Sequence, residues 1–79
     1  MDISALIAAV GSGLPGEYAL RLEGEGPFEI PSLNIHSFQE VRIICTDVGS
    51  LTFNRVTIAG EGALLSWPSV GDGAVRFVS

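Results

Sequence analysis

The sequence predicts a mainly β fold with one short N-terminal helix, in a single domain that covers residues 1–79. Only one segment, residues 2–10, carries apolar residues at helical spacing. Several later segments alternate apolar with polar residues, which is the period of a strand with one buried face. Hydrophobic residues make up 47% of the chain, enough for one core, and the charged fraction of 16% argues against disorder.

The helix is predicted from Asp2, a favourable N-cap residue, to Val10. Gly11 ends it, and the glycine-rich residues 12–16 form a turn. Its apolar stripe consists of Ile3, Leu6, Ile7 and Val10, which are spaced i, i+3, i+4 and i+7. The stripe should dock on the rest of the core, because the helix lacks the basic polar face of a membrane-surface helix.

Residues 17–79 form the predicted β-strand region. A first strand carries Tyr18, Leu20 and Leu22 on one face, and a short strand at 28–30 lies between two prolines, which favour an edge, strand end or bend. The segment 32–58 contains two half-copies whose alternation breaks at His36-Ser37 and at Asn54-Arg55. A one-residue slip would send every later side chain to the wrong face, so the chain should bend or bulge at both breaks.

The alternation also predicts which side chains point inward. Two later strands should carry Leu65 with Trp67 and Val75 with Phe77, and core packing is the default role of both aromatic residues, with an interface anchor as the alternative. Ile44 and Val78 should be covered by the helix or by a partner. The inward residues of the central segment are Leu33, Ile35, Phe38, Val41, Ile43, Cys45, Leu51, Phe53, Val56 and Ile58.

Two stretches, LNIHSFQEVRI (33–43) and LTFNRVTIAGEG (51–62), resemble rungs of right-handed parallel β-helices such as those of pectate lyases and phage tailspikes. The helix, the turn and the strand with Tyr18 resemble the N-terminal cap of such proteins. The resemblance implies a short right-handed parallel β-helix of about three rungs, which would lean on its helix and on another chain. Nothing catalytic carries over, because the chain has no aspartate pair and its arginines are scattered.

An α+β fold remains an alternative, with the N-terminal helix packed on an antiparallel β-meander. Residues 41–46 and 51–58 could form one hairpin, and residues 55–59 and 63–67 could form another. Local hairpins are the commoner arrangement in a chain of this length. The breaks at His36-Ser37 and Asn54-Arg55 favour the β-helix.

Charge narrows the range of partners. Nine acidic residues face four arginines and no lysine, which gives a net charge of -5. The chain therefore lacks the basic stripe of a nucleic-acid binder and should be repelled by anionic membranes. An acidic protein suits a basic protein surface, although mild acidity can also serve solubility alone.

The candidate partner-binding residues are acidic. Gly24-Glu25-Gly26, Gly60-Glu61-Gly62 and Gly71-Asp72-Gly73 are either ordinary turns or, if they cluster, an acidic rim. The predicted surface consists of Glu17, Glu23, Glu25, Glu29, Glu61 and Asp72. No catalytic, metal or cofactor-binding set is predicted, and the single histidine, His36, should lie at a corner.

Cys45 is alone, so no intramolecular disulfide can form, and it should fill the core. An unpaired cysteine favours a reducing cytosol, and the N-terminus lacks the basic region of a signal peptide. The longest uninterrupted apolar run, Ala5 to Val10, is too short to span a bilayer.

These features lead to two functional hypotheses. The first is a cytoplasmic, non-enzymatic inhibitor that starts at its own Met1 and binds a basic surface of a nucleic-acid-handling complex. A phage or mobile-element anti-CRISPR-like DNA mimic is its concrete form, with carboxylates in place of phosphates. The alternative is a capping, trimerising or carbohydrate-binding β-helix module of a virion or secreted protein, and in either case the chain could self-associate. An enzyme is not predicted, because the sequence offers no active site.

Overall fold

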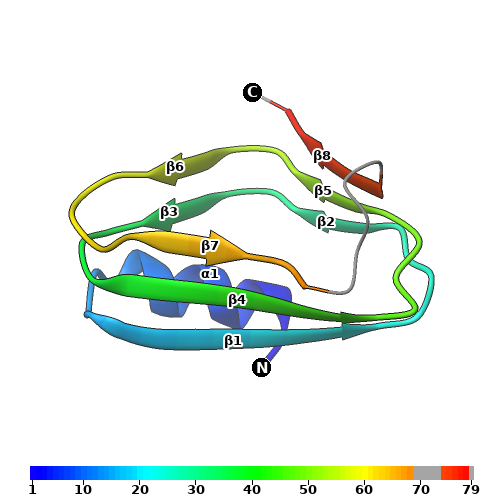
Figure 1. Ribbon diagram of the computed structural model, residues 1–79, viewed down its shortest axis with the longest axis horizontal. Helices are drawn as coiled ribbons and strands as arrows, with labels where there is room; N and C mark the ends of the chain where they lie inside the picture. The colour runs from blue at the N-terminus through cyan, green and yellow to red at the C-terminus, as the bar shows by residue number, and fades with distance from the viewer. Residues whose placement is uncertain (69–73, 79) are drawn as a thin grey trace.

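The computed structural model describes residues 1–68 and 74–78 and shows one helix with a stack of short parallel strands (Figure 1). Helix α1 spans Ile3–Gly11. The described strands are β1 (Gly16–Glu23), β2 (Phe28–Ile30), β3 (Leu33–Ile35), β4 (Gln39–Thr46), β5 (Leu51–Phe53), β6 (Val56–Ile58), β7 (Leu64–Ser66) and β8 (Val75–Phe77).

The strands form three sheets, ordered β1-β4-β7, β2-β5-β8 and β3-β6. Every strand pairing among the described residues is parallel. Strands that follow one another in sequence therefore lie in different sheets, and each pass of the chain stacks on the pass before. The prediction of a mainly β, short β-helix-like fold is confirmed. The antiparallel meander is wrong, because β4 pairs with β1 and β7 while β6 pairs with β3, so neither predicted hairpin forms.

Backbone hydrogen bonds stack the corners as well as the strands. At one end of the rungs, the amide of Gly16 donates to the carbonyl of Phe38 (3.0 Å), and the amide of Phe38 donates to the carbonyl of Glu61 (2.8 Å). At the other end, the amide of Gly49 donates to the carbonyl of Glu25 (2.9 Å). The predicted breaks at His36-Ser37 and Asn54-Arg55 are confirmed, since they separate β3 from β4 and β5 from β6.

The predicted inward position of Phe38 is wrong. Phe38 has a positive φ of 60° and is 59% exposed, whereas Gln39 is fully buried. The left-handed conformation at Phe38 shifts the phase of the strand by one residue. Gln39 then lies on the same face as Val41, Ile43 and Cys45, which are buried as predicted.

Gln39 connects three parts of the chain. Its Nε2 donates to the carbonyls of Val10 (3.0 Å) and Leu14 (2.9 Å), and its Oε1 accepts from the amide of His36 (2.7 Å). A buried amide is tolerated only when its donors and acceptors are paired. Gln39 thus connects the last turn of α1 and the following loop to the corner between β3 and β4.

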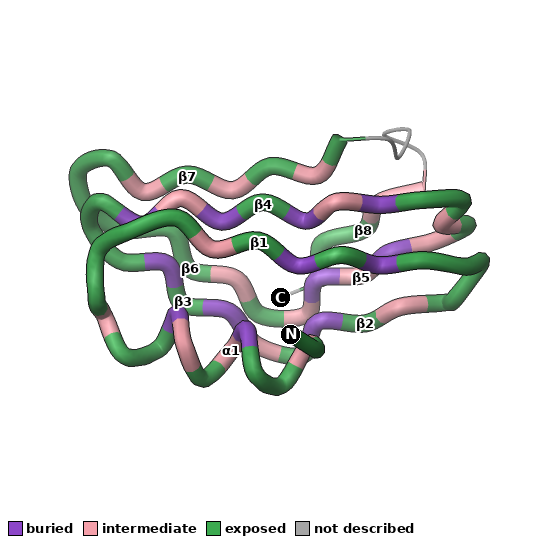
Figure 2. Tube along the Cα trace, turned by 90° about the horizontal axis from the view of Figure 1, so that it is seen from below, coloured by how far each residue is buried: buried purple, intermediate pink, exposed green. Residues whose placement is uncertain are grey.

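Helix α1 covers one end of the stack. Asp2 caps it as predicted, since its Oδ1 accepts from the amide of Ala5 (2.8 Å). Leu6 and Val10 on its inner face are fully buried. The helix packs against β1 and β3, and Figure 2 shows it beyond the first pass of strands. The predicted helix at 2–10 and its docking on the core are confirmed.

Candidate interaction surfaces

The last described layer of the stack is apolar and only half-buried. We call it the end layer, and it consists of Val56, Ile58, Leu65, Trp67, Val75 and Phe77. Five of these residues continue columns whose preceding members are buried. Ile58 lies in register with Ile35, and their exposed fractions are 50% and 1%. Phe77 lies in register with Phe53, and their exposed fractions are 53% and 0%.

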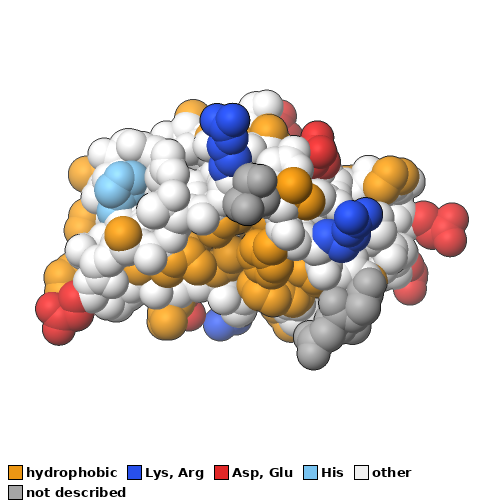
Figure 3. All heavy atoms as spheres, turned by 90° about the horizontal axis from the view of Figure 1, so that it is seen from above, with side chains coloured by type: hydrophobic (Ala, Val, Ile, Leu, Met, Phe, Trp, Pro, Cys, Tyr) orange, Lys and Arg blue, Asp and Glu red, His pale blue; other side chains and the backbone are white. Residues whose placement is uncertain are grey.

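At the opposite end of the stack, helix α1 covers the apolar side chains. Leu20 on β1 and Leu33 on β3 are at most 1% exposed, and α1 packs against both of these strands. The described residues place no comparable element over the end layer. Figure 3 views the side of the molecule that carries β6 and β8, and it shows hydrophobic side chains gathered in a central band with acidic side chains at the margins.

Strand edges accompany this apolar surface. β7 and β8 are the outermost strands of their sheets, and β6 is the outermost strand of the two-stranded sheet. On that side, the backbone groups of all three have no strand partner among the described residues. An unpaired strand edge is a template for a further strand.

Three aromatic rings meet at this end of the stack. The rings of Phe53 and Phe77 are nearly parallel, with an interplanar angle of 10° and centroids 4.8 Å apart. Trp67 is tilted against both, at 5.7 Å from Phe53 and 5.3 Å from Phe77. The Phe53–Phe77 separation matches the spacing of neighbouring strands, so the rings repeat along the stack as the backbone does. Trp67 packs against the core as predicted, whereas the predicted burial of Phe77 is wrong, because Phe77 is 53% exposed and only one face of its ring is covered by Phe53.

The predicted acidic residues do not form one rim. Glu23 and Glu25 lie where β1 turns into β2, whereas Glu17 and Glu61 lie at the other end of the rungs (Figure 1). All four are exposed, as is Glu29 on β2. Asp72 lies outside the described residues.

The corner between β1 and β2 carries one acidic residue that was not predicted from the sequence to belong to a site. The Gly49–Glu25 hydrogen bond stacks the turn after β4 on the turn after β1. This brings exposed Asp47 to the same corner as Glu23 and Glu25. We call these three residues the acidic corner. The only ion pair among the described residues lies elsewhere, between Arg42 and Glu40 (3.6 Å).

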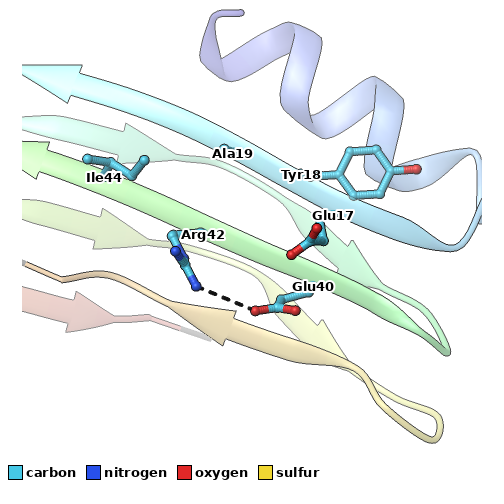
Figure 4. A pocket seen from close by; sticks show the side chains of 6 residues that line it. All are labelled: Glu17, Tyr18, Ala19, Glu40, Arg42 and Ile44. Atoms are coloured by element: carbon cyan, nitrogen blue, oxygen red, sulfur yellow. Dashed lines mark ion pairs between the residues drawn. The ribbon is translucent and has the colours of Figure 1, made fainter.

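The outer face of the β1-β4-β7 sheet has a shallow hollow of about 230 Å³. Figure 4 shows Glu17, Glu40 and Arg42 around it, with Tyr18 turned toward α1. The Tyr18 hydroxyl donates to the carbonyl of Leu14 (2.7 Å) and is therefore engaged. Ligand pockets usually enclose roughly 300–1,000 Å³, so this hollow is too small and too open to define one. Ile44 also lines this hollow and is only half-buried, and Val78 is 45% exposed. Neither of the two residues that were expected to need cover is therefore fully covered by the described part of the chain.

A larger hollow of about 440 Å³ lies beside the start of α1. Its walls are mostly apolar, and they include Met1, Ile3 and Phe28. Its charged groups are Asp2, whose carboxylate is already bound to the helix N-terminus, and Arg21. Two charged groups, one of them engaged, do not make a convergent polar site.

His36 and Cys45 form no reactive pair. His36 lies at the corner as predicted, with its Nδ1 3.4 Å from Oε1 of Gln39. Cys45 is 2% exposed, and burial raises the pKa of its thiol. The described residues bring together no group of three metal-binding side chains. In the described part of the chain, no helix has the length and apolar character needed to cross a membrane.

Comparison with protein-family models, with curated proteins and with solved structures finds no match for this chain.

The end layer was not among the sites predicted from the sequence. Its signal was nevertheless present, because Leu33 and Ile35 recur as Val56 and Ile58. A recurring inward pair indicates a column, and every column of a stack has a last member. The missing information was which end the helix would cover.

Proposed function

We propose that this chain is a non-enzymatic protein-interaction module, in which α1 closes one end of a parallel β-stack and the end layer binds a further layer of β structure. One observation carries the proposal: Ile35 on β3, which packs against α1, is 1% exposed, whereas Ile58, in register with it at the opposite end, is 50% exposed. The resemblance to the N-terminal cap and first rungs of pectate-lyase and tailspike β-helices supports the same reading.

The strand edges define how such a partner binds. Adding a strand to an exposed edge gains backbone hydrogen bonds, and apolar side chains at alternate positions gain burial. Helix α1 lies across the other end, so copies of this chain cannot stack head to tail into an open filament through these two surfaces. The partner layer is therefore supplied by a different β segment.

The proposal is tested by fusing a copy of residues 33–58 after Ser79. The amide of Val78 donates to the carbonyl of Phe53 (2.8 Å), as the amide of Asn54 donates to the carbonyl of Ile30 (3.0 Å). Val78 is thus equivalent to Asn54, and β6 begins two residues after Asn54. The fused copy begins at the same spacing from Val78, so its strands are in frame to cover the end layer.

We expect the fused chain to unfold in one transition at a temperature at least about 4 °C higher, which corresponds to about 1 kcal/mol in a domain of this size. The matched control carries the same copy with its inward residues replaced by serine, and it should unfold at the parent's temperature. Equal melting temperatures for the two fusions would contradict the proposal.

A second candidate function rests on the acidic corner. Glu23, Glu25 and Asp47 are exposed at one corner, where carboxylates could bind a basic protein surface as a DNA mimic does. Reversing Glu23, Glu25 and Asp47 to lysine should abolish binding to such a partner while leaving the thermal transition within a few degrees of the parent's, because all three are exposed. A folded triple variant that binds a basic partner as tightly as the parent would exclude this function.

A further inference from the structure

We infer that the end layer selects its partner by an aromatic residue: the incoming β layer runs parallel to β8 and places a planar aromatic side chain over Phe77. The inference rests on the proposed function and specifies the partner of the same surface. It follows from the polarity of the ladders, the spacing of the rings and the partial exposure of Phe77.

The polarity of the partner follows from the ladders. Each pairing among the described strands is parallel, and residues pair in register, as in Leu51 with Val75 and Phe53 with Phe77. A partner of the same polarity continues all three sheets at once, because β6, β7 and β8 present their edges on the same side of the stack. A second copy meeting this surface head to head would run its strands in the opposite direction.

The aromatic preference follows from the rings. Phe77 lies flat on Phe53, with centroids 4.8 Å apart, so its other face is directed along the stack. That face accounts for the exposure of a side chain whose partner in register is fully buried. Parallel strands repeat at about 4.7–4.9 Å, so the residue in register on the next strand stacks on Phe77 as Phe77 stacks on Phe53. Trp67 packs beside these stacked rings, with its own ring tilted by 57° against that of Phe77.

The probe is a synthetic peptide with the sequence of residues 33–54, which supplies one complete pass of the chain with an aromatic residue at the Phe53 position. The comparison peptide has leucine at that position. Trp67 is the only tryptophan and contacts Phe77, so its emission reports binding at the end layer without a label.

We expect the aromatic peptide to shift the Trp67 emission to shorter wavelength and to bind roughly two- to twelvefold more tightly than the leucine peptide, which corresponds to about 0.5–1.5 kcal/mol for an aromatic pair. In the Phe77→Leu variant, the two peptides should bind equally, because the aromatic pair is then absent from both complexes. In the Phe38→Leu control, the preference should persist, since Phe38 is exposed at a corner away from the end layer.

Polarity is read from a nitroxide on the N-terminus of a shorter peptide, residues 49–54, which covers β8 alone. In parallel docking the label should broaden the amide signal of Val75 more than that of Val78. Stronger broadening at Val78 would overturn the inference, and so would a head-to-head dimer that excludes both peptides.

The remaining outcomes separate the two proposals. If both long peptides bind equally, the aromatic preference is overturned and the proposed function stands. If neither peptide binds and the fused copy of residues 33–58 is not stabilising, both are overturned. If neither binds but the fused copy stabilises the chain to the same extent with leucine at its Phe53 position, the aromatic preference alone fails.

Discussion

Gln39 is the buried polar residue on which the junction of helix and stack depends. Its amide group satisfies the carbonyls of Val10 and Leu14 and the amide of His36. Within the described part of the chain, no buried side-chain nitrogen or oxygen lacks a partner. The Gln39 side chain therefore links the end of α1 to the corner between β3 and β4, where the carbonyls of Val10 and Leu14 each have a second donor, the amide of Gly13 (3.1 Å) and the hydroxyl of Tyr18 (2.7 Å).

Gln39→Leu should be destabilising although it makes the core more apolar. It removes the acceptor of the His36 amide and one of the two donors to each of the carbonyls of Val10 and Leu14, and an unpaired buried group costs about 1–3 kcal/mol. We expect the free energy of unfolding in urea to fall by about 1 kcal/mol or more. Glutamate at this position should be worse at pH 7 and partly recover in acid, because a carboxylate would face two carbonyl oxygens. A Gln39→Leu variant as stable as the parent would contradict this role.

Gly60, in the turn Gly60-Glu61-Gly62, occupies a position that only glycine fits. Its φ is +110°, and a Cβ atom there would collide with the hydroxyl of Ser37 on the corner beneath it. Gly60→Ala should therefore lower the unfolding free energy by more than about 1 kcal/mol. The matched control is Gly11→Ala at the end of α1, where a Cβ meets nothing within 4 Å, and it should be neutral or stabilising by up to about 1 kcal/mol. Equal effects at both positions would refute close stacking of the corners.

Cys45 makes stability depend on alkaline pH. Burial raises the pKa of its thiol in the folded state, so the unfolded chain loses its proton first as pH rises. The stabilising contribution is complete below the pKa of the unfolded thiol, about 8.5, and is lost as pH rises through the higher folded pKa. Urea titrations between pH 7 and 9.5 should show declining stability in the parent and a flatter profile in Cys45→Val. Identical profiles would contradict this assignment.

At the scale of elements, α1 packs over the first layer of strands and buries it. Leu6 is fully buried between the helix and the stack, and truncating a buried leucine costs about 2–5 kcal/mol. Leu6→Ala should therefore remove much of the stability of so small a domain, as measured by urea unfolding with Trp67 fluorescence. The exposed control Ala8→Gln should stay within about 0.5 kcal/mol of the parent. Similar losses in both variants would mean that the helix does not bury the first layer.

The sequence predicted these elements unevenly, for physical reasons. Spacing sufficed for α1 and for the strand breaks, because periodicity depends on local geometry. It failed at Phe38, where a left-handed residue changed the phase, and at Gln39, whose burial depends on carbonyls 25 and 29 residues away in the chain. The separation of Glu25 from Glu61 was equally invisible, since it depends on which sheet each strand joins.

At the scale of the whole molecule, the two ends differ. Among the described residues, α1 covers one end of the stack and no element covers the other, and exposed acidic residues lie at the corners at both ends of the rungs. An exposed apolar layer bounded by strand edges makes a small protein prone to unspecific association. Such a surface is consistent with an interface, and this asymmetry is the central claim.

Solvent paramagnetic relaxation of methyl groups, measured with a soluble gadolinium chelate, tests that claim most directly. Ile35 and Ile58 occupy the same column and have the same side chain, but only Ile58 is exposed. We predict strong relaxation at Ile58 and Val75 and almost none at Ile35 and Leu51, with the strong signals suppressed when the peptide of residues 33–54 is added. Equal protection of Ile35 and Ile58 in the free chain, or relaxation at Ile58 unchanged by saturating peptide, would contradict the account.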